Sequence, residues 1–182
     1  SNTDSAIGPG NFQLIRLGDS SGGADIRDAM AGEAYDGGET CFTTSGEGSQ
    51  IPTEPGNTVG PASQGLNTRL GDWQGPVNSI DHPRDINICQ GEDVNIDSAG
   101  DIVDEAVAEA TAYLYTDYVA DNLLGVKGLK CDTGDIMDVA PNQVERRILN
   151  IVIGDCTGED HGSSNIDYLG SGCFFLTQDI DT

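Results

Sequence analysis

The sequence predicts an α+β fold: a small, mostly antiparallel sheet with two or three short helices, in a loop-rich chain that contains disulfide bonds. Hydrophobic residues make up 36% of the 182 residues, which is enough for a core and fits a single domain over residues 1–182. Twenty-five glycines and seven prolines, with only 5% aromatic residues, indicate many turns. Five cysteines without a CxxC motif or zinc-like Cys/His spacing favour disulfides over a structural metal site.

The first part of the chain alternates short elements with turns. Residues 11–18 carry β-favouring side chains between glycines and predict a strand. Residues 23–32 have apolar side chains at helical spacing and a terminal glycine, so they predict a short helix. Residues 33–57 have the composition of turns and predict no regular element.

A second helix is expected over residues 59–71, despite Gly65 in its middle. Just before it, Pro55, Gly56 and Asn57 form a sequence typical of a tight turn. These three residues are therefore interpreted as structural turn residues that lead into the helix.

Residues 101–125 predict the longest helix, which is acidic on its outer side. Asp101 suits its N-cap and Gly125 its end. Apolar side chains recur at steps of three and four, which places them on one face that we expect to pack into the core. They are Val103, Val107, Ala110, Leu114 and Tyr118.

The C-terminal third predicts two buried strands, over residues 146–156 and 168–178, joined by a polar loop. If these strands pair antiparallel about that loop, Cys156 lies close to Cys173. A disulfide between these two cysteines is the first choice, although five cysteines allow 15 ways of forming two bridges. The fifth thiol would be left over or used between chains.

The formal charge of −23 limits the possible partners. It repels phosphate backbones and anionic lipid, so neither nucleic-acid binding nor membrane-surface binding is expected. Between Arg84 and Lys127 there are ten acidic residues and no basic one. This stretch predicts either a solvated, salt-tolerant surface or a specific site for a cation.

If the acidic stretch is a cation site, calcium is the expected cation. Oxygen-bearing side chains alternate at the start of this acidic segment, as they do in calcium loops. The candidate ligands are Asp93, Asn95, Asp97, Asp101, Asp104 and Glu105. Gly100 and Ile102 each come two places later than an EF-hand requires, so a non-standard calcium loop stands against a plain acidic turn that caps the following helix.

Five sequence blocks carry a resemblance to a known family. In chain order they read GPGNFQLIRLGDSSGGADIRDAMAG, CFTTSGEGSQIPTEPGNTVGPASQGLNTRLGDW, DHPRDINICQG, RRILNIVIGDC and GSGCFFLTQ. Together they resemble the TadE/TadG-like proteins associated with assembly of Flp (tight-adherence) pili. The resemblance covers most of the chain and leaves residues 92–140 as an acidic helical elaboration.

The resemblance implies an exported, periplasmic or cell-surface protein that is tethered in family members by an N-terminal transmembrane helix. The start of this sequence has neither a signal segment nor such a helix, so we expect that an anchor was removed or that this is the soluble portion of a longer product. The resemblance also implies that Gly60 and Pro61, like residues 55–57, are structural turn residues, needed for backbone shape and not for chemistry.

The expected function is a non-enzymatic structural or assembly component of a pilus or adhesion apparatus at the cell surface. It would act by contact with like or related subunits, in a homo-oligomer or filament, with no direct membrane binding except through the absent anchor. One alternative is a calcium-stabilised extracellular filament or adhesin subunit. The other is a secreted hydrolase that uses carboxylates, because 31 acidic residues offer many pairs but no nucleophile–base set is visible.

Overall fold

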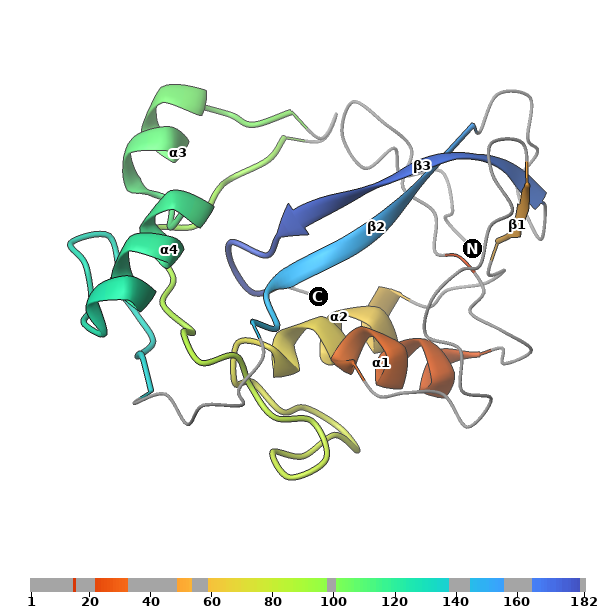
Figure 1. Ribbon diagram of the computed structural model, residues 1–182, viewed down its shortest axis with the longest axis horizontal. Coiled ribbons are helices and arrows are strands. Elements are labelled where there is room, and N and C mark those ends of the chain that lie inside the picture. Colours follow the sequence, from red (N-terminus) through yellow and green to blue (C-terminus); the bar gives the residue numbers. More distant parts are fainter. Residues whose placement is uncertain are drawn as a thin grey trace.

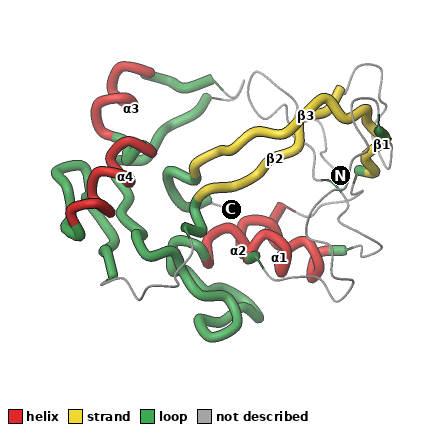
Figure 2. Tube along the Cα trace, in the orientation of Figure 1, coloured by secondary structure: helices red, strands yellow, loops and turns green. Residues whose placement is uncertain are grey.

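The structure is a computed structural model of the chain, and it describes residue 15 and residues 22–32, 49–53, 59–97, 101–137, 145–155 and 165–180. Figures 1 and 2 show three parts joined by long loops: a pair of helices, a small twisted sheet beside it, and a lobe of two further helices at one end of the sheet. The predicted α+β class, antiparallel sheet and loop-rich character are therefore confirmed.

The helix pair consists of α1 (Gly23–Ala31) and α2 (Val59–Thr68), as predicted. Gly65 of α2 packs directly against α1. A Cβ atom at Gly65 would stand 2.2 Å from the carbonyl oxygen of Arg27 and 2.7 Å from the Cβ of Met30. The glycine that weakened the helix prediction is thus what permits this close packing.

Gly60 and Pro61 correct one expectation, because both lie in the first turn of α2 and not in a separate turn. Proline is accepted there because the first amide groups of a helix have no partner within the helix. Pro61 also packs on α1, since a Cβ at Gly23 would stand 2.9 Å from its Cγ. The expected turn residues Pro55, Gly56 and Asn57 lie outside the described residues.

The sheet has the order β1-β3-β2, with β1 at Gln50–Pro52, β2 at Ile148–Asp155 and β3 at Asn165–Phe175. The expected antiparallel pairing of the two C-terminal strands is confirmed, and β3 begins three residues earlier than predicted. Strand β1 falls within residues 33–57, where only turns were expected. The predicted strand 11–18 is described only at Ile15, which forms a single bridge with Thr53.

The disulfides differ from the expectation. Cys89 is bonded to Cys131, with a Cα–Cα distance of 4.9 Å. Cys173 is an exposed free thiol, and its partner across the sheet is Asn150. Cys156 itself lies outside the described residues, but its neighbour Asp155 is opposite Asp167, far from Cys173 along the strand. This register contradicts the expected Cys156–Cys173 bridge, which needs Cα atoms within about 7 Å.

The predicted acidic helix is two helices, α3 (Glu105–Thr111) and α4 (Tyr115–Leu124). Asp104, not Asp101, is the N-cap, and its carboxylate accepts the Val107 N–H at 3.1 Å. The helix breaks where Gly91 packs against it, because a Cβ at Gly91 would lie 2.3 Å from the carbonyl oxygen of Thr111. A continuous helix was therefore the wrong expectation for residues 101–125.

The break also changes which side chains the predicted apolar face buries. Tyr118 is fully buried, as expected, but Val103 and Val107 are 65% and 51% exposed. These two valines therefore belong to the surface of the lobe and not to its core.

Candidate functional site

The end of α4 and the residues after it carry an unusual concentration of exposed aliphatic side chains. We call residues 123–129 the 123–129 loop. Leu123 is 82% exposed, Leu124 71%, Val126 58% and Leu129 108%. Single exposed aliphatic residues are ordinary, but four within seven residues are typical of a contact surface.

Asp121 holds the 123–129 loop in place through two hydrogen bonds. Asp121 is 5% exposed; its carboxylate accepts the Gly128 N–H at 2.8 Å, and its backbone oxygen accepts the Gly125 N–H at 2.8 Å. Gly125 ends α4 in the left-handed conformation, with φ of 65°, which glycine adopts readily. The conformation of the loop is therefore fixed by its hydrogen bonds to the buried Asp121.

Two further contacts hold the end of the loop. The disulfide joins Cys131 to Cys89, which is fully buried. The ammonium group of Lys130 donates to the Glu109 carbonyl oxygen at 3.0 Å and lies 3.5 Å from the Asp117 carboxylate. The two ends of the loop are therefore anchored on different parts of the lobe.

The core under α4 is polar. We call its five members, Asp85, Asn87, Tyr113, Tyr118 and Arg147, the polar core; none is more than 1% exposed. The Arg147 guanidinium donates to four backbone carbonyl oxygens, those of residues 87, 89, 176 and 177, at 2.7–3.1 Å. Its Cζ also lies 4.5 Å from the centroid of the Phe175 ring. Arg147 therefore connects the sheet to the 85–91 segment.

Asp85 is the anionic partner in this core. Its carboxylate accepts the backbone N–H groups of Asn87, Arg146 and Arg147 and the hydroxyl of Tyr118, at 3.0 Å for the shorter Tyr118 contact. A second hydroxyl, that of Tyr113, donates to Asp121 at 2.8 Å. The hydrogen bonds thus run from the sheet through the polar core to the residue that holds the 123–129 loop.

The pKa shifts in the polar core follow from burial. Burial lowers the pKa of Arg147 to about 10, and the negative charge of Asp85 opposes that shift. Burial raises the pKa of Tyr118 well above its ordinary value, and Asp85 raises it further. Burial also raises the pKa of Tyr113. At neutral pH the arginine is charged and both phenols are neutral, and each of these groups is engaged in the hydrogen bonds described above.

Most of the chain's few cationic side chains already have hydrogen-bond or ion-pair partners within the chain. Arg69 and Arg146 donate to the Met30 and Ala31 carbonyl oxygens at the C-terminal end of α1, where positive charge is favourable. Arg27, Arg84 and Lys130 each form an ion pair with an acidic residue. Among the described residues, Lys127 is the one cationic side chain with neither an ion pair nor a hydrogen bond, and it lies in the 123–129 loop.

The six expected calcium ligands have identifiable positions. Asp104 caps α3 and Glu105 is its first residue, which matches the helix-capping alternative. The segment before them turns back on itself, because the Asp97 N–H donates to the Asp101 oxygen at 2.9 Å and the Val103 N–H to the Asn95 oxygen at 3.0 Å. Within the described ranges no three acidic, histidine or cysteine side chains are placed to hold a metal ion. Residues 98–100 of the same loop are not described, so the calcium site stays a prediction.

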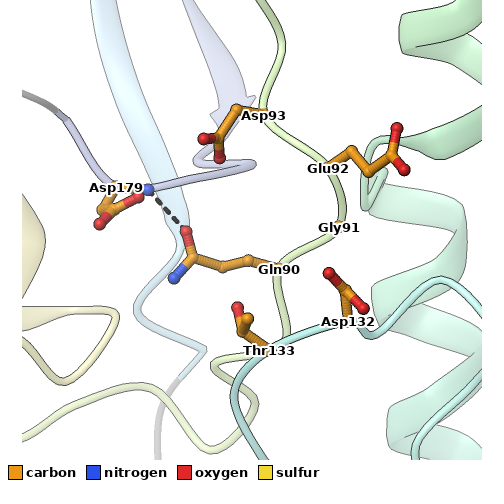
Figure 3. A pocket seen from close by; sticks show the side chains of 7 residues that line it. All are labelled: Gln90, Gly91, Glu92, Asp93, Asp132, Thr133 and Asp179. Carbon is orange, nitrogen blue, oxygen red and sulfur yellow. Dashed lines mark hydrogen bonds between the residues drawn. The ribbon is translucent and has the colours of Figure 1, made fainter.

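One depression of about 380 Å³ carries the acids that come nearest to a carboxylate site. Its lining residues are Gln90, Gly91, Glu92, Asp93, Asp132, Thr133 and Asp179. Figure 3 shows the four carboxylates directed to different sides of Gln90, whose amide oxygen accepts the Asp179 N–H at 2.8 Å. The lining contains these four carboxylates and no histidine, lysine or arginine. The hydrolase alternative stays a prediction.

Comparisons with protein-family models, curated proteins and solved structures give no match to this chain. The resemblance to TadE/TadG-like proteins therefore rests on the five sequence blocks alone and stays a prediction. In the ranges that the structure describes, no helix has the length and apolar character needed to cross a bilayer.

The sequence analysis missed the 123–129 loop and the polar core. A signal for the loop was nevertheless present. A face that contains Leu114 and Tyr118 continues at residues 121 and 122, so Leu123 and Leu124 fall outside it. Aliphatic residues outside the buried face of a helix indicate exposure.

Proposed function

We propose that this protein is a non-enzymatic structural component of an assembly at the cell surface, such as a pilus, and that it acts by protein–protein contact. The observation that carries the proposal is the 123–129 loop: four exposed aliphatic side chains held in place by a buried carboxylate. Such a surface gains free energy only when another surface covers it.

The use of the buried polar groups supports the same proposal. In the polar core, each titratable side chain is engaged in hydrogen bonds that hold one segment against another. Catalytic groups instead need access to a substrate and a pKa matched to the reaction. The five sequence blocks that resemble pilus-assembly proteins add the expected setting, at the cell surface.

Sedimentation velocity tests the proposal. The purified chain should associate with itself, or with the surface proteins encoded beside its gene, and more strongly as salt rises. The reason is that the self-repulsion of chains with charge −23 falls as the Debye length shortens from about 30 Å at 0.01 M to about 8 Å at 0.15 M. A chain that sediments as a monomer at every salt concentration and captures none of those proteins would refute it.

The same experiment should be run with calcium and with a chelator, because the calcium-stabilised filament subunit is the first alternative. Association or a raised melting temperature that requires calcium and is reversed by chelator at matched ionic strength would favour that alternative.

A further inference from the structure

We infer that the 123–129 loop binds a second copy of this chain, on a different surface of that copy, so that the contact is head-to-tail. The receiving surface is formed by residues 101–107, at the start of α3. The inference rests on the proposed function, because it names the two surfaces and the partner of that contact.

The loop is preorganised for binding. Asp121 accepts the N–H groups of Gly125 and Gly128, and the Cys89–Cys131 disulfide follows directly after the loop. Little conformational freedom is therefore left to lose when a partner covers Leu124 or Leu129. Ile80 serves as the comparison residue, because it is an equally exposed aliphatic residue (88%) that lies outside the 123–129 loop.

Charge selects an acidic partner. Lys127 is the one cationic side chain in the described part of the chain that has no partner of its own. A receiving surface must therefore combine apolar side chains with carboxylates, and a phosphate backbone offers no such apolar area. A second copy of this chain, with charge −23, supplies carboxylates in excess.

Residues 101–107 have both properties. Ile102, Val103 and Val107 are 44%, 65% and 51% exposed. Asp101, Asp104 and Glu105 are exposed among them, and the segment contains no basic residue. The aliphatic side chains of the loop can cover those of the 101–107 surface while Lys127 faces its carboxylates.

The two surfaces lie at different ends of the α3–α4 lobe: the 123–129 loop is at the C-terminal end of α4, and the 101–107 surface is at the start of α3 (Figure 1). Each copy therefore keeps a free loop at one end and a free receiving surface at the other after one contact has formed. A contact between unlike surfaces adds further copies unless its rotation closes a ring. Two loops facing each other would instead bring the Lys127 side chains together.

Paired variants of the whole chain test the inference. Leu123→Ser/Leu124→Ser disables the loop and leaves the receiving surface intact; Val103→Ser/Val107→Ser does the opposite. Each variant alone should associate about tenfold or more weakly than the native chain in sedimentation from about 1 µM to about 1 mM. An equimolar mixture of the two should form a heterodimer that adds no third copy. Ile80→Ser removes an equally exposed aliphatic side chain elsewhere and should change nothing.

Three results would overturn the inference. In the first, the native chain associates and the loop variant associates equally well; the proposed function then stands and the assigned surface is wrong. In the second, the mixture of variants stays monomeric, which excludes contact between these two surfaces. In the third, the native chain is monomeric but floats with phosphatidylcholine or phosphatidylglycerol vesicles and the loop variant does not, which would assign the loop to a lipid surface. A monomer with no captured protein and no vesicle binding removes the proposed function as well.

Discussion

Two neighbouring parts of the molecule, the polar core under α4 and the 123–129 loop after it, distribute their side chains in opposite ways. Arg147, Asp85 and Asn87 are 0% exposed, whereas Leu123 and Leu129 are 82% and 108% exposed. A fold governed only by burial of apolar area would do the reverse. In this molecule the polar groups therefore specify where the backbone lies, and the aliphatic side chains of the loop are left available for contact.

The largest effect is expected where the polar core loses its cation. Arg147→Ala removes the donors of four backbone carbonyl oxygens, and it also removes a guanidinium charge that interacts with the buried Asp85. The free energy of unfolding should fall by about 3–5 kcal/mol in a urea titration, as when one member of a buried charged network is lost.

Two variants keep that experiment interpretable. Arg147→Lys retains the charge but not the forked donors, so it should lie between Arg147→Ala and the native chain. Arg84→Ala breaks an ion pair with Asp135, a residue that is 57% exposed, and should cost about 0–1 kcal/mol. Equal losses for Arg147→Ala and Arg84→Ala would show that the polar core does not hold the fold together.

The next effect concerns the covalent link between core and loop. Cys89→Ala/Cys131→Ala opens a bridge across a sequence separation of 42 residues and should cost about 2–4 kcal/mol by freeing the unfolded chain. Cys173→Ala is the control, because that thiol is exposed and free, and its unfolding midpoint should not move. The reverse result would mean that Cys89 and Cys131 are not bonded in the protein.

Asp121 tests the hydrogen-bonded link. Asp121→Ala leaves the Tyr113 hydroxyl and the Gly128 N–H without their acceptor and should cost about 2–3 kcal/mol. Amide exchange at Gly128 should accelerate by more than the loss of global stability explains. In Asp121→Asn the remaining side-chain oxygen can still accept both groups. We therefore expect a smaller loss of stability than in Asp121→Ala, and slower amide exchange at Gly128 than in that variant. Unchanged exchange in Asp121→Ala would show that the loop is not held from below.

Tyr118 and Tyr113 give the polar core a pH dependence with a definite sign. Because their folded-state pKa values lie above the ordinary value of about 10, the stability from these neutral phenols is complete below pH 10 and declines as pH rises toward the folded-state values. In an absorbance titration of the native protein, these two phenols should ionise only at unfolding. In denaturant, all five tyrosines should titrate near pH 10.

Tyr118→Phe isolates one of the two phenols. It removes the hydroxyl that donates to Asp85 and should cost about 1–2 kcal/mol at pH 7. One late-ionising group should vanish from the native titration at the same time. If the native chain already shows all its tyrosines ionising together near pH 10, the polar core is open to water.

The parts of the fold that could be predicted are those with local causes. Apolar spacing and a terminal glycine gave α1, and two β-branched runs around a polar loop gave the β2–β3 pair. What could not be predicted depends on distant contacts. Arg147 looks like the first residue of a strand, and its burial requires carbonyl groups from two other segments of the chain. The helix break at residues 112–114 likewise lies against Gly91, a residue from a distant part of the chain that the helical pattern does not include.

The smallest effect on stability is expected in the loop, and it completes the comparison. Leu124→Ser and Leu129→Ser replace residues that are already 71% and 108% exposed. The free energy of unfolding should therefore change by no more than about 0.5 kcal/mol. Tyr118→Phe, in contrast, removes one oxygen atom from a fully buried ring and should cost more than either leucine. If a loop leucine proves as costly as the buried hydroxyl, that leucine packs on this same chain and the loop is not a free contact surface. If both leucine variants keep the native midpoint while losing association, the polar core holds the loop in place and the loop makes the contact.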